Sequence, residues 1–500
     1  MPGWQPAQAA RRAALAGAWL VAVSSVQAVG APAALKPCRL PGVEHGALCG
    51  VVQRPLDPAL PQGRSIDVHV AVLPALARNK KPDPVFFFAG GPGQSAIALA
   101  GPISRLLSRL QNRRDIVLID QRGTGLSAPL RCADEANTRP LAEQLDPQRQ
   151  VAQITACRLA LQTLPHGDLR LYTTLLAMQD ADAVRQALGA ERINLVGASY
   201  GTRAALDYMR QFPQAVRRVV LDGVAPPDMR LPAAAAVDAQ AAFDALLAAC
   251  DSEPACHTRH PLMREQWAKL AAGLPRDVVV AHPITGRDEH VLLTRDMLAG
   301  LVRQLLYVPA LASALPVAVA DAAQGRFGAL VGLAGTLGSG RRGAALAQGM
   351  HFSVVCAEDM PLAAGPAPTA DRSAAALGSG VAGVYQQVCA DWPRGAVPAD
   401  FYRIPPAPAA TLLLSGGIDP ATPPRHAARV AQALGPLARH EVVANAGHGV
   451  LSLPCQRDVL FRFIDADSDG LALLVDAGCA ASMPRPLAFV PVSAPADAAR

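Results

Sequence analysis

The chain has 500 residues, 51% of them hydrophobic and 17% charged, so it is too apolar to be disordered. Its net charge of +6 comes without long Lys/Arg runs and with only 4% aromatic residues, which argues against binding to nucleic acid. The length fits roughly two to four domains, or one large core with an insertion.

The first 28 residues are predicted to be an export signal. Arg11 and Arg12 form a short basic region, residues 13–23 are apolar, and residues 26–28 make a small-residue cleavage site. The alternative is a membrane anchor, but the apolar run is shorter than the roughly 20 residues that a span needs. No later stretch is expected to be long and apolar enough to cross a bilayer. We therefore expect export to the periplasm or the medium, without stable membrane insertion.

The ten cysteines fit an oxidising compartment, where disulfides are the default. The sequence does not fix their connectivity, and a zinc site is the alternative. The chain lacks a CxxC pair and clustered histidines, so we expect no metal. The cysteines form five sequence-local pairs: Cys38/Cys49, Cys132/Cys157, Cys250/Cys256, Cys356/Cys389 and Cys455/Cys479.

The first part of the chain, from residue 38 to about 225, alternates strand-like and helix-like segments. Continuous apolar runs separated by helices are typical of a parallel sheet that is covered on both faces. The predicted strands are 66–72, 85–88, 116–119, 193–196 and 219–221, and the predicted helices are 177–188 and 202–211.

An Ala-rich segment with a mostly helical pattern follows, and then the strand–helix order returns. Strands are predicted at 412–414 and 442–443, and helices at 425–434 and 456–464. The inserted segment is expected to lie over the carboxyl ends of the strands, where ligands bind. The predicted divisions are the signal peptide (1–28), the first part of the core (29–225), a helical cap (226–405) and the C-terminal part of the core (406–500).

The strongest motif is Gly197-Ala198-Ser199-Tyr200-Gly201, between a predicted strand and a predicted helix. This is the context of a nucleophile elbow, in which the serine occupies a sharp turn and the flanking glycines relieve crowding. The oxyanion of an acyl-transfer intermediate needs preorganised N–H donors. We expect these from the backbone of Tyr200 and of Gly91, which lies in the glycine-rich turn 90–93.

A serine hydroxyl needs a base, and the chain order in this type of motif is serine, acid, histidine. His448 lies late in the chain between two glycines, and Asp419 directly follows a predicted strand. These residues are the predicted base and the acid that orients it. Asp222, at the end of an earlier strand, is the alternative acid.

Taken together, these motifs resemble the prolyl-iminopeptidase-like α/β-hydrolases, and more closely the exported tripeptidyl aminopeptidases with a characteristic C-terminal region. The resemblance implies an α/β-hydrolase fold. The segments that carry it are 90–93, 120–127, 197–201, 419–423 and 447–449, with Cys356, Glu358, Asp359, the stretch 389–393 and the late Cys455/Cys479 pair.

The resemblance implies a serine exopeptidase that releases short units, from one amino acid to a tripeptide, from free peptide N-termini. It implies no metal or organic cofactor. Glu358 and Asp359 are candidates for binding the substrate ammonium group. Prolyl iminopeptidases usually carry His before the glycine-rich turn, whereas this chain has Ala89, which weakens a strict proline specificity.

Two other functions stay open at this point. A carboxylic ester hydrolase would use the same three residues, since the difference between the two activities lies in the cap. A non-catalytic binding protein on a hydrolase scaffold is disfavoured by the full set of catalytic candidates.

Overall fold

The computed structural model describes residues 1, 3, 34–133, 138–339, 346–363, 377 and 380–489. Of the predicted signal peptide, only Met1 and Gly3 belong to these residues, so that prediction lies outside the described part of the chain.

Within the described residues, nine strands form one mixed sheet in the order β1-β2-β3-β5-β4-β6-β7-β10-β11. The first three strands run antiparallel to their neighbours, and every pair from β5 to β11 is parallel. The mostly parallel sheet of the α/β-hydrolase prediction is therefore confirmed. The strands are β1 Lys36–Cys38, β2 Ala47–Pro55, β3 Ser65–Leu73, β4 Val85–Phe88, β5 Ile116–Ile119, β6 Ile193–Ala198, β7 Val216–Asp222, β10 Thr411–Gly416 and β11 Ala438–Val443.

Helices cover both faces of this sheet, because alternate side chains of its strands point to opposite sides. In β4, for example, Phe86 and Phe88 join one buried cluster while Val85 and Phe87 join another. The first face is covered by α5 Thr174–Ala187, α6 Tyr200–Gln211 and α17 Pro424–Leu434. The second is covered by α1 Ala100–Leu106, α2 Ser108–Gln111, α18 Pro454–Asp465 and α19 Asp469–Leu473.

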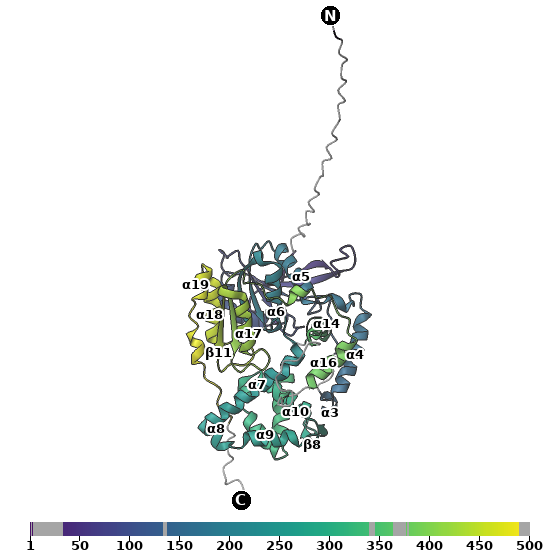
Figure 1. Ribbon diagram of the computed structural model, residues 1–500, viewed down its shortest axis with the longest axis vertical. Helices are drawn as coiled ribbons and strands as arrows, with labels where there is room; N and C mark the ends of the chain where they lie inside the picture. Colours follow the sequence, from purple (N-terminus) through teal and green to yellow (C-terminus); the bar gives the residue numbers. More distant parts are fainter. Residues whose placement is uncertain are drawn as a thin grey trace.

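A separate cap with its own hydrophobic cluster lies at the lower end of Figure 1. It contains a β-hairpin that the helical prediction missed, in which β8 Arg276–Ala281 pairs with β9 Asp288–Leu293. Its helices are α7 Leu231–Ser252, α8 Pro254–Arg259, α9 Met263–Ala272, α10 Arg295–Leu306, α11 Pro309–Ala312, α12 Leu315–Ala323 and α13 Gly328–Ser339.

The predicted insertion 226–405 does not pack as one unit. Its later helices, α14 Gln348–Glu358 and α16 Gly380–Ala390, contribute Met350, Phe352 and Val388 to the cluster on the first face of the sheet. Helix α4 Pro147–Gln162 packs beside α16 (Figure 1). The remaining helices are α3 Leu141–Gln144, α15 Met360–Ala363 and the 3₁₀ turns η1 Leu169–Leu171, η2 Pro213–Ala215, η3 Ala399–Tyr402, η4 Gly435–Leu437 and η5 Gly478–Ser482.

One helix in the described part of the chain, Ala233–Ser252 within α7, is long and apolar enough to cross a membrane by length and composition. The expectation that no later stretch passes this test is therefore wrong. The helix is Ala-rich, and it packs in the cap against α8, α10 and α16 with Phe243 fully buried. A single helix of this kind is weak evidence for a membrane span, because core helices share its composition.

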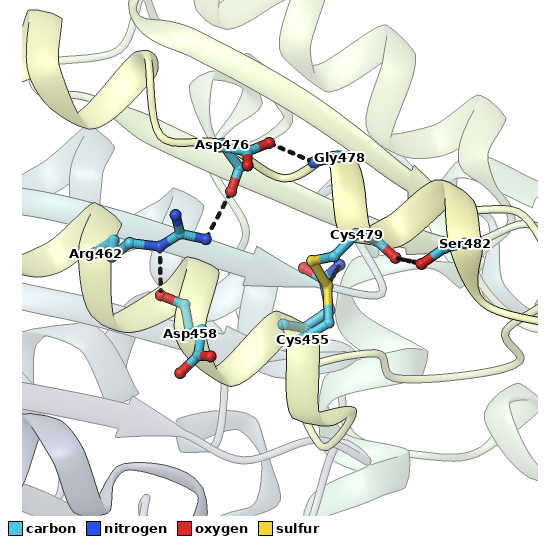
Figure 2. Close-up of a disulfide and its surroundings, with 8 residues drawn as sticks. Cys455, Asp458, Arg462, Asp476, Gly478, Cys479 and Ser482 are labelled. Atoms are coloured by element: carbon cyan, nitrogen blue, oxygen red, sulfur yellow. Dashed lines mark hydrogen bonds between the residues drawn. A yellow bond between two sulfur atoms is a disulfide. The ribbon is translucent and has the colours of Figure 1, made fainter.

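All ten cysteines lie in the described part of the chain and form five disulfides, each within a sequence-local pair. Figure 2 shows the last of them, Cys455–Cys479, which joins the start of α18 to η5. Arg462 reinforces this junction by donating to the backbone carbonyl of Asp476 over 2.8 Å. Five disulfides indicate an oxidising, extracytoplasmic compartment.

Candidate active site

Ser199 lies at a strained turn between β6 and α6. Its backbone has φ 56° and ψ −123°, a conformation that non-glycine residues rarely adopt. The two flanking glycines are sterically required: a Cβ on Gly197 would lie 2.4 Å from the Gly201 carbonyl oxygen, and one on Gly201 would lie 2.0 Å from the Phe88 carbonyl oxygen. The motif therefore forms the sharp strand–helix turn that the sequence predicts.

The glycine-rich turn 90–93 meets this elbow. A Cβ on Gly90 would lie 3.2 Å from the Ser199 Cβ, so the turn passes directly beside the serine. Gly91 has φ +114°, and a Cβ there would lie 2.6 Å from the next glycine's nitrogen, that of Gly93. Tyr200 is the first residue of α6, a position at which the backbone N–H has no acceptor within its own helix. Both predicted oxyanion donors thus belong to backbone that flanks Ser199.

His448 and Asp419 are hydrogen-bonded to each other. The His448 Nδ1 lies 2.8 Å from Asp419 Oδ2, and the aspartate is fully buried while the imidazole is 18% exposed. Asp419 also accepts bonds from the backbone of Ala421 and Thr422 and from the Thr422 hydroxyl. These donors fix the carboxylate in one orientation toward the ring.

The pKa shifts of His448 and Asp419 fit a histidine base that is oriented by an ionised aspartate. Burial alone lowers the pKa of His448, but the charge and hydrogen bond of Asp419 outweigh burial and raise it above 6.5. Burial alone raises the pKa of Asp419, and the charge of His448, with its hydrogen bonds, lowers it overall. The carboxylate therefore stays ionised beside the imidazole at neutral pH.

His448 lies above the end of β7. A Cβ on Gly223, which follows that strand, would lie 3.3 Å from the His448 Cε1. From the cap, Tyr307 makes an edge contact with the imidazole at 5.3 Å between ring centroids. The cap therefore lies over the carboxyl ends of the parallel strands at this point.

Asp222 connects the loop of Ser199 to the loop of His448 through backbone hydrogen bonds. Among the described contacts, it has no hydrogen bond to the side chain of either residue. Its backbone carbonyl accepts from the Ser199 N–H at 2.8 Å. Its carboxylate accepts from the N–H groups of Val450 and Leu451, at 2.9 to 3.0 Å. Burial raises the pKa of Asp222 to about 6. The contacts favour Asp419, rather than Asp222, as the acid that orients His448.

Glu358 and Asp359 are fully buried and bound to Arg203 of α6. Asp359 takes two bonds of 2.9 Å from the guanidinium, and Glu358 also accepts from the backbone and hydroxyl of Thr174. Burial raises the pKa of Glu358 to about 7, against the opposing charge of Arg203. The Thr174 hydroxyl in turn bonds the Tyr200 hydroxyl, behind the elbow. Binding of a substrate amine by this acidic pair stays a prediction, which these contacts do not favour.

Two segments of the chain match models of known protein families. Residues 83–249 match the family model described as alpha/beta hydrolase fold, and residues 375–467 match the one described as TAP-like protein. Serine protease Hip1 of Mycobacterium tuberculosis is 30% identical over 357 residues, which cover 64% of this chain and 68% of that protein. This chain belongs to the TAP-like α/β-hydrolase family.

Other relatives of this TAP-like hydrolase carry different activities in their names. The tripeptidyl aminopeptidase of Streptomyces lividans is 30% identical over 248 residues, 45% of each chain. Carboxylesterase B of Mycobacterium tuberculosis is 29% identical over 426 residues, 78% of each chain. The chain is a serine hydrolase, and its relatives include both peptidases and an esterase.

Two side chains near the site were given no role by the sequence prediction. Thr422 bonds Asp419 and lies 3.2 Å from the His448 Nδ1, and Arg203 forms ion pairs with both members of the buried acidic pair. Thr422 lies three residues after the predicted acid, within the segment 419–423 that carries the family resemblance, but no role was predicted for it. No sequence signal pointed to Arg203, because its partners lie more than 150 residues away in the chain. Among the described residues, no three His, Cys, Asp or Glu side chains form a group that could hold a metal ion.

Proposed function

We propose that this chain is an exported serine exopeptidase that releases short units from free peptide N-termini through an acyl-enzyme. The observation that carries this proposal is the partly buried 2.8 Å bond between His448 and Asp419. The loop of His448 is linked through Asp222 to the strained turn of Ser199. The names of the relatives, a serine protease and tripeptidyl aminopeptidases, support peptides as substrates.

In the proposed reaction, the Ser199 hydroxyl attacks the scissile carbonyl while His448 takes its proton. The oxyanion receives hydrogen bonds from the backbone N–H groups of Gly91 and Tyr200. His448 then gives the proton to the leaving amine, and the C–N bond breaks to leave an ester on Ser199. A water molecule, activated by the same imidazole, hydrolyses that ester and restores the hydroxyl. Asp419 holds the ring and stabilises its charged form.

The test is a profile of the mature protein against free and N-blocked aminoacyl, dipeptidyl and tripeptidyl amides, with Ser199→Ala as the blank. We expect hydrolysis that depends on a free α-amino group, and a loss of at least about 10³-fold in Ser199→Ala with an unchanged unfolding transition. Equal rates on N-blocked substrates would contradict an aminopeptidase. Retained turnover in Ser199→Ala would contradict the nucleophile.

A carboxylic ester hydrolase is the second candidate, favoured by the likeness to Carboxylesterase B over 78% of both chains. It predicts fast turnover of simple acyl esters and none of the peptide amides. A non-catalytic scaffold predicts that a fluorophosphonate fails to label Ser199.

We also propose that the signal in residues 1–28 directs the protein to the periplasm or the medium. Detection of the mature chain, beginning near residue 29, in the cell envelope or culture fluid would support this, and an intact N-terminus in the cytoplasm would contradict it.

A further inference from the structure

A partly buried histidine lies against the glycine-rich turn and takes no part in the proposed reaction. His351 is the fourth residue of α14, and its Nδ1 lies 3.1 Å from the carbonyl oxygen of Pro92. Its Nε2 lies 2.6 Å from the hydroxyl of Tyr385, on α16. The ring therefore bridges the turn that carries the proposed oxyanion donor Gly91 and a second helix.

The partners determine the state of this imidazole. A backbone carbonyl only accepts hydrogen bonds, so Nδ1 must carry a proton and donate it to Pro92. In the neutral ring, Nε2 is then an acceptor for the Tyr385 hydroxyl. Burial lowers the pKa of His351, against the opposing effect of the Pro92 carbonyl, which favours this neutral form. In this form Nδ1 of His351 donates to the Pro92 carbonyl, and Nε2 accepts from the Tyr385 hydroxyl.

The N-terminus of α14 holds the same turn by a second bond. The backbone N–H of Ala347, one residue before the helix, donates to the Gly93 carbonyl at 2.9 Å. The two segments are in close contact, since a Cβ on Gly93 would lie 2.9 Å from the Ala347 carbonyl oxygen. Consecutive carbonyls of the turn, those of Pro92 and Gly93, are therefore both bound by the start of α14.

Helices α14 and α16 are fastened to each other next to this contact. The disulfide Cys356–Cys389 joins them, five residues after His351 and four after Tyr385. The Tyr385 ring also packs on His351 and on Phe352, with centroids 5.7 and 5.3 Å apart. The hydroxyl of Tyr385 is thereby held at a fixed place relative to α14.

We propose that His351, oriented by Tyr385, is a positioning residue that fixes the turn 90–93 so that the Gly91 N–H points at the developing oxyanion. The proposal rests on the proposed acyl-transfer function. Neither side chain needs to touch substrate: His351 acts through the Pro92 carbonyl, and Tyr385 acts through His351. A small displacement of an oxyanion donor reduces transition-state stabilisation more than it reduces ground-state binding.

The test compares kcat and KM for His351→Phe, His351→Asn and Tyr385→Phe on the substrate that the unmodified protein hydrolyses best. His351→Phe keeps a ring but loses the donor, and we expect kcat to fall about 10- to 100-fold at nearly constant KM. Asn places an amide N–H close to the Nδ1 position, so His351→Asn should recover part of that loss. Tyr385→Phe should lose severalfold, with no further loss when it is added to His351→Phe.

Ser353→Ala is the matched control. Ser353 lies on α14 and accepts a buried bond from the Trp392 indole at 3.1 Å, but it does not reach the turn. It should lose stability without losing kcat. The proposal is overturned if His351→Phe keeps kcat within twofold, or if Ser353→Ala loses as much kcat. If His351→Phe does not fold, Tyr385→Phe decides: a kcat loss beyond that of Ser353→Ala supports the proposal, and an equal effect overturns it. Absence of turnover and of fluorophosphonate labelling in the unmodified protein would instead contradict the proposed function.

Discussion

Two buried carboxylates lie close to His448 and bind different donors. Asp419 bonds the imidazole, whereas Asp222 bonds the backbone of residues 450 and 451. We therefore expect Asp419→Asn to lower kcat by about 10³- to 10⁴-fold, because the amide no longer holds the correct tautomer or stabilises the imidazolium. Asp222→Asn keeps an acceptor oxygen for the two N–H groups and should cost less than about tenfold. Steady-state kinetics of both variants checks this.

Thermal unfolding of the two variants supplies the control, since both carboxylates are buried and either change can affect folding. The assignment of the acid would be contradicted if Asp222→Asn, while still folded, lost as much activity as Asp419→Asn. Asp222, which the sequence offered as the alternative, would then be the acid.

The pH dependence of kcat/KM belongs to the same pair. His448 must be neutral to accept the serine proton, and the charge of Asp419 raises its pKa above 6.5. Activity should therefore fall as the pH drops through a midpoint above 6.5. In Asp419→Asn that midpoint should move to lower pH, because the raising charge is gone. The charge of Asp222 also raises the pKa of His448, but less than Asp419 does, so Asp222→Asn should shift the midpoint by a smaller amount. A larger shift in Asp222→Asn than in Asp419→Asn would contradict the assignment.

At the scale of elements, helices α6 and α14 are joined by one guanidinium. Arg203 of α6 binds Glu358 and its neighbour Asp359 at the end of α14, and all three are buried. Arg203→Met would leave two buried carboxylates without a counter-charge, which destabilises a protein by about 3–5 kcal/mol. Urea unfolding at pH 7 measures this. The control is Arg429→Met, which breaks a half-exposed pair with Asp228 and should cost about 1 kcal/mol or less.

The loss in Arg203→Met should also depend on pH. The folded-state pKa of Glu358 is raised to about 7, above its ordinary value of 4.5, so the folded protein takes up a proton that the unfolded chain does not bind between these values. Without Arg203 the ionised form is penalised further, so the folded-state pKa of Glu358 should rise above about 7. Between about 4.5 and 7 both folded proteins hold this proton, so the destabilisation should stay constant there and grow as the pH rises above about 7. A destabilisation that does not grow above pH 7 would contradict the unpaired carboxylate as its cause.

The elements that surround Ser199 could be predicted from the sequence because their causes are local. A strand, two glycines and a helix leave the chain one conformation at residue 199, and His448 stands between glycines that let its loop turn tightly. The extent of the cap could not be predicted in this way. Helices α7 and α14 have similar apolar patterns, and only the surface that each one meets decides that α7 packs in the cap and α14 on the sheet. The contact of His351 with Pro92 could not be predicted either, because the two residues are 259 positions apart in the chain and meet only in the folded structure.

At the scale of the whole molecule, the last described segment runs from the sheet to the cap (Figure 1). It starts at η5, which the disulfide in Figure 2 fixes to α18. The Met483 carbonyl accepts from Asn445 of the core at 2.8 Å. Farther along, Arg485 donates to the Ala245 carbonyl in α7, and the Phe489 N–H donates to the Ser313 carbonyl at 2.9 Å. The segment is therefore fixed to the sheet-bearing core by a disulfide at its start and to the cap by hydrogen bonds.

Removing this connection should loosen the cap without unfolding the sheet. Phe489 is half-exposed and lines an apolar pocket together with residues of α11, α12 and α13. A chain that ends at Ser482 loses that contact together with the bonds at 485 and 489. Each hydrogen bond contributes about 1 kcal/mol, so opening of the cap should become about tenfold more frequent or more. Limited proteolysis should then cleave residues 231–339 faster, while the fragments of the sheet persist. A chain that ends at Phe489 keeps these contacts and is the matched control. If the two truncated chains are cleaved at the same rate, the segment does not hold the cap, and the direct contacts of the cap with the sheet-bearing core, such as that of Tyr307 with His448, must do so alone.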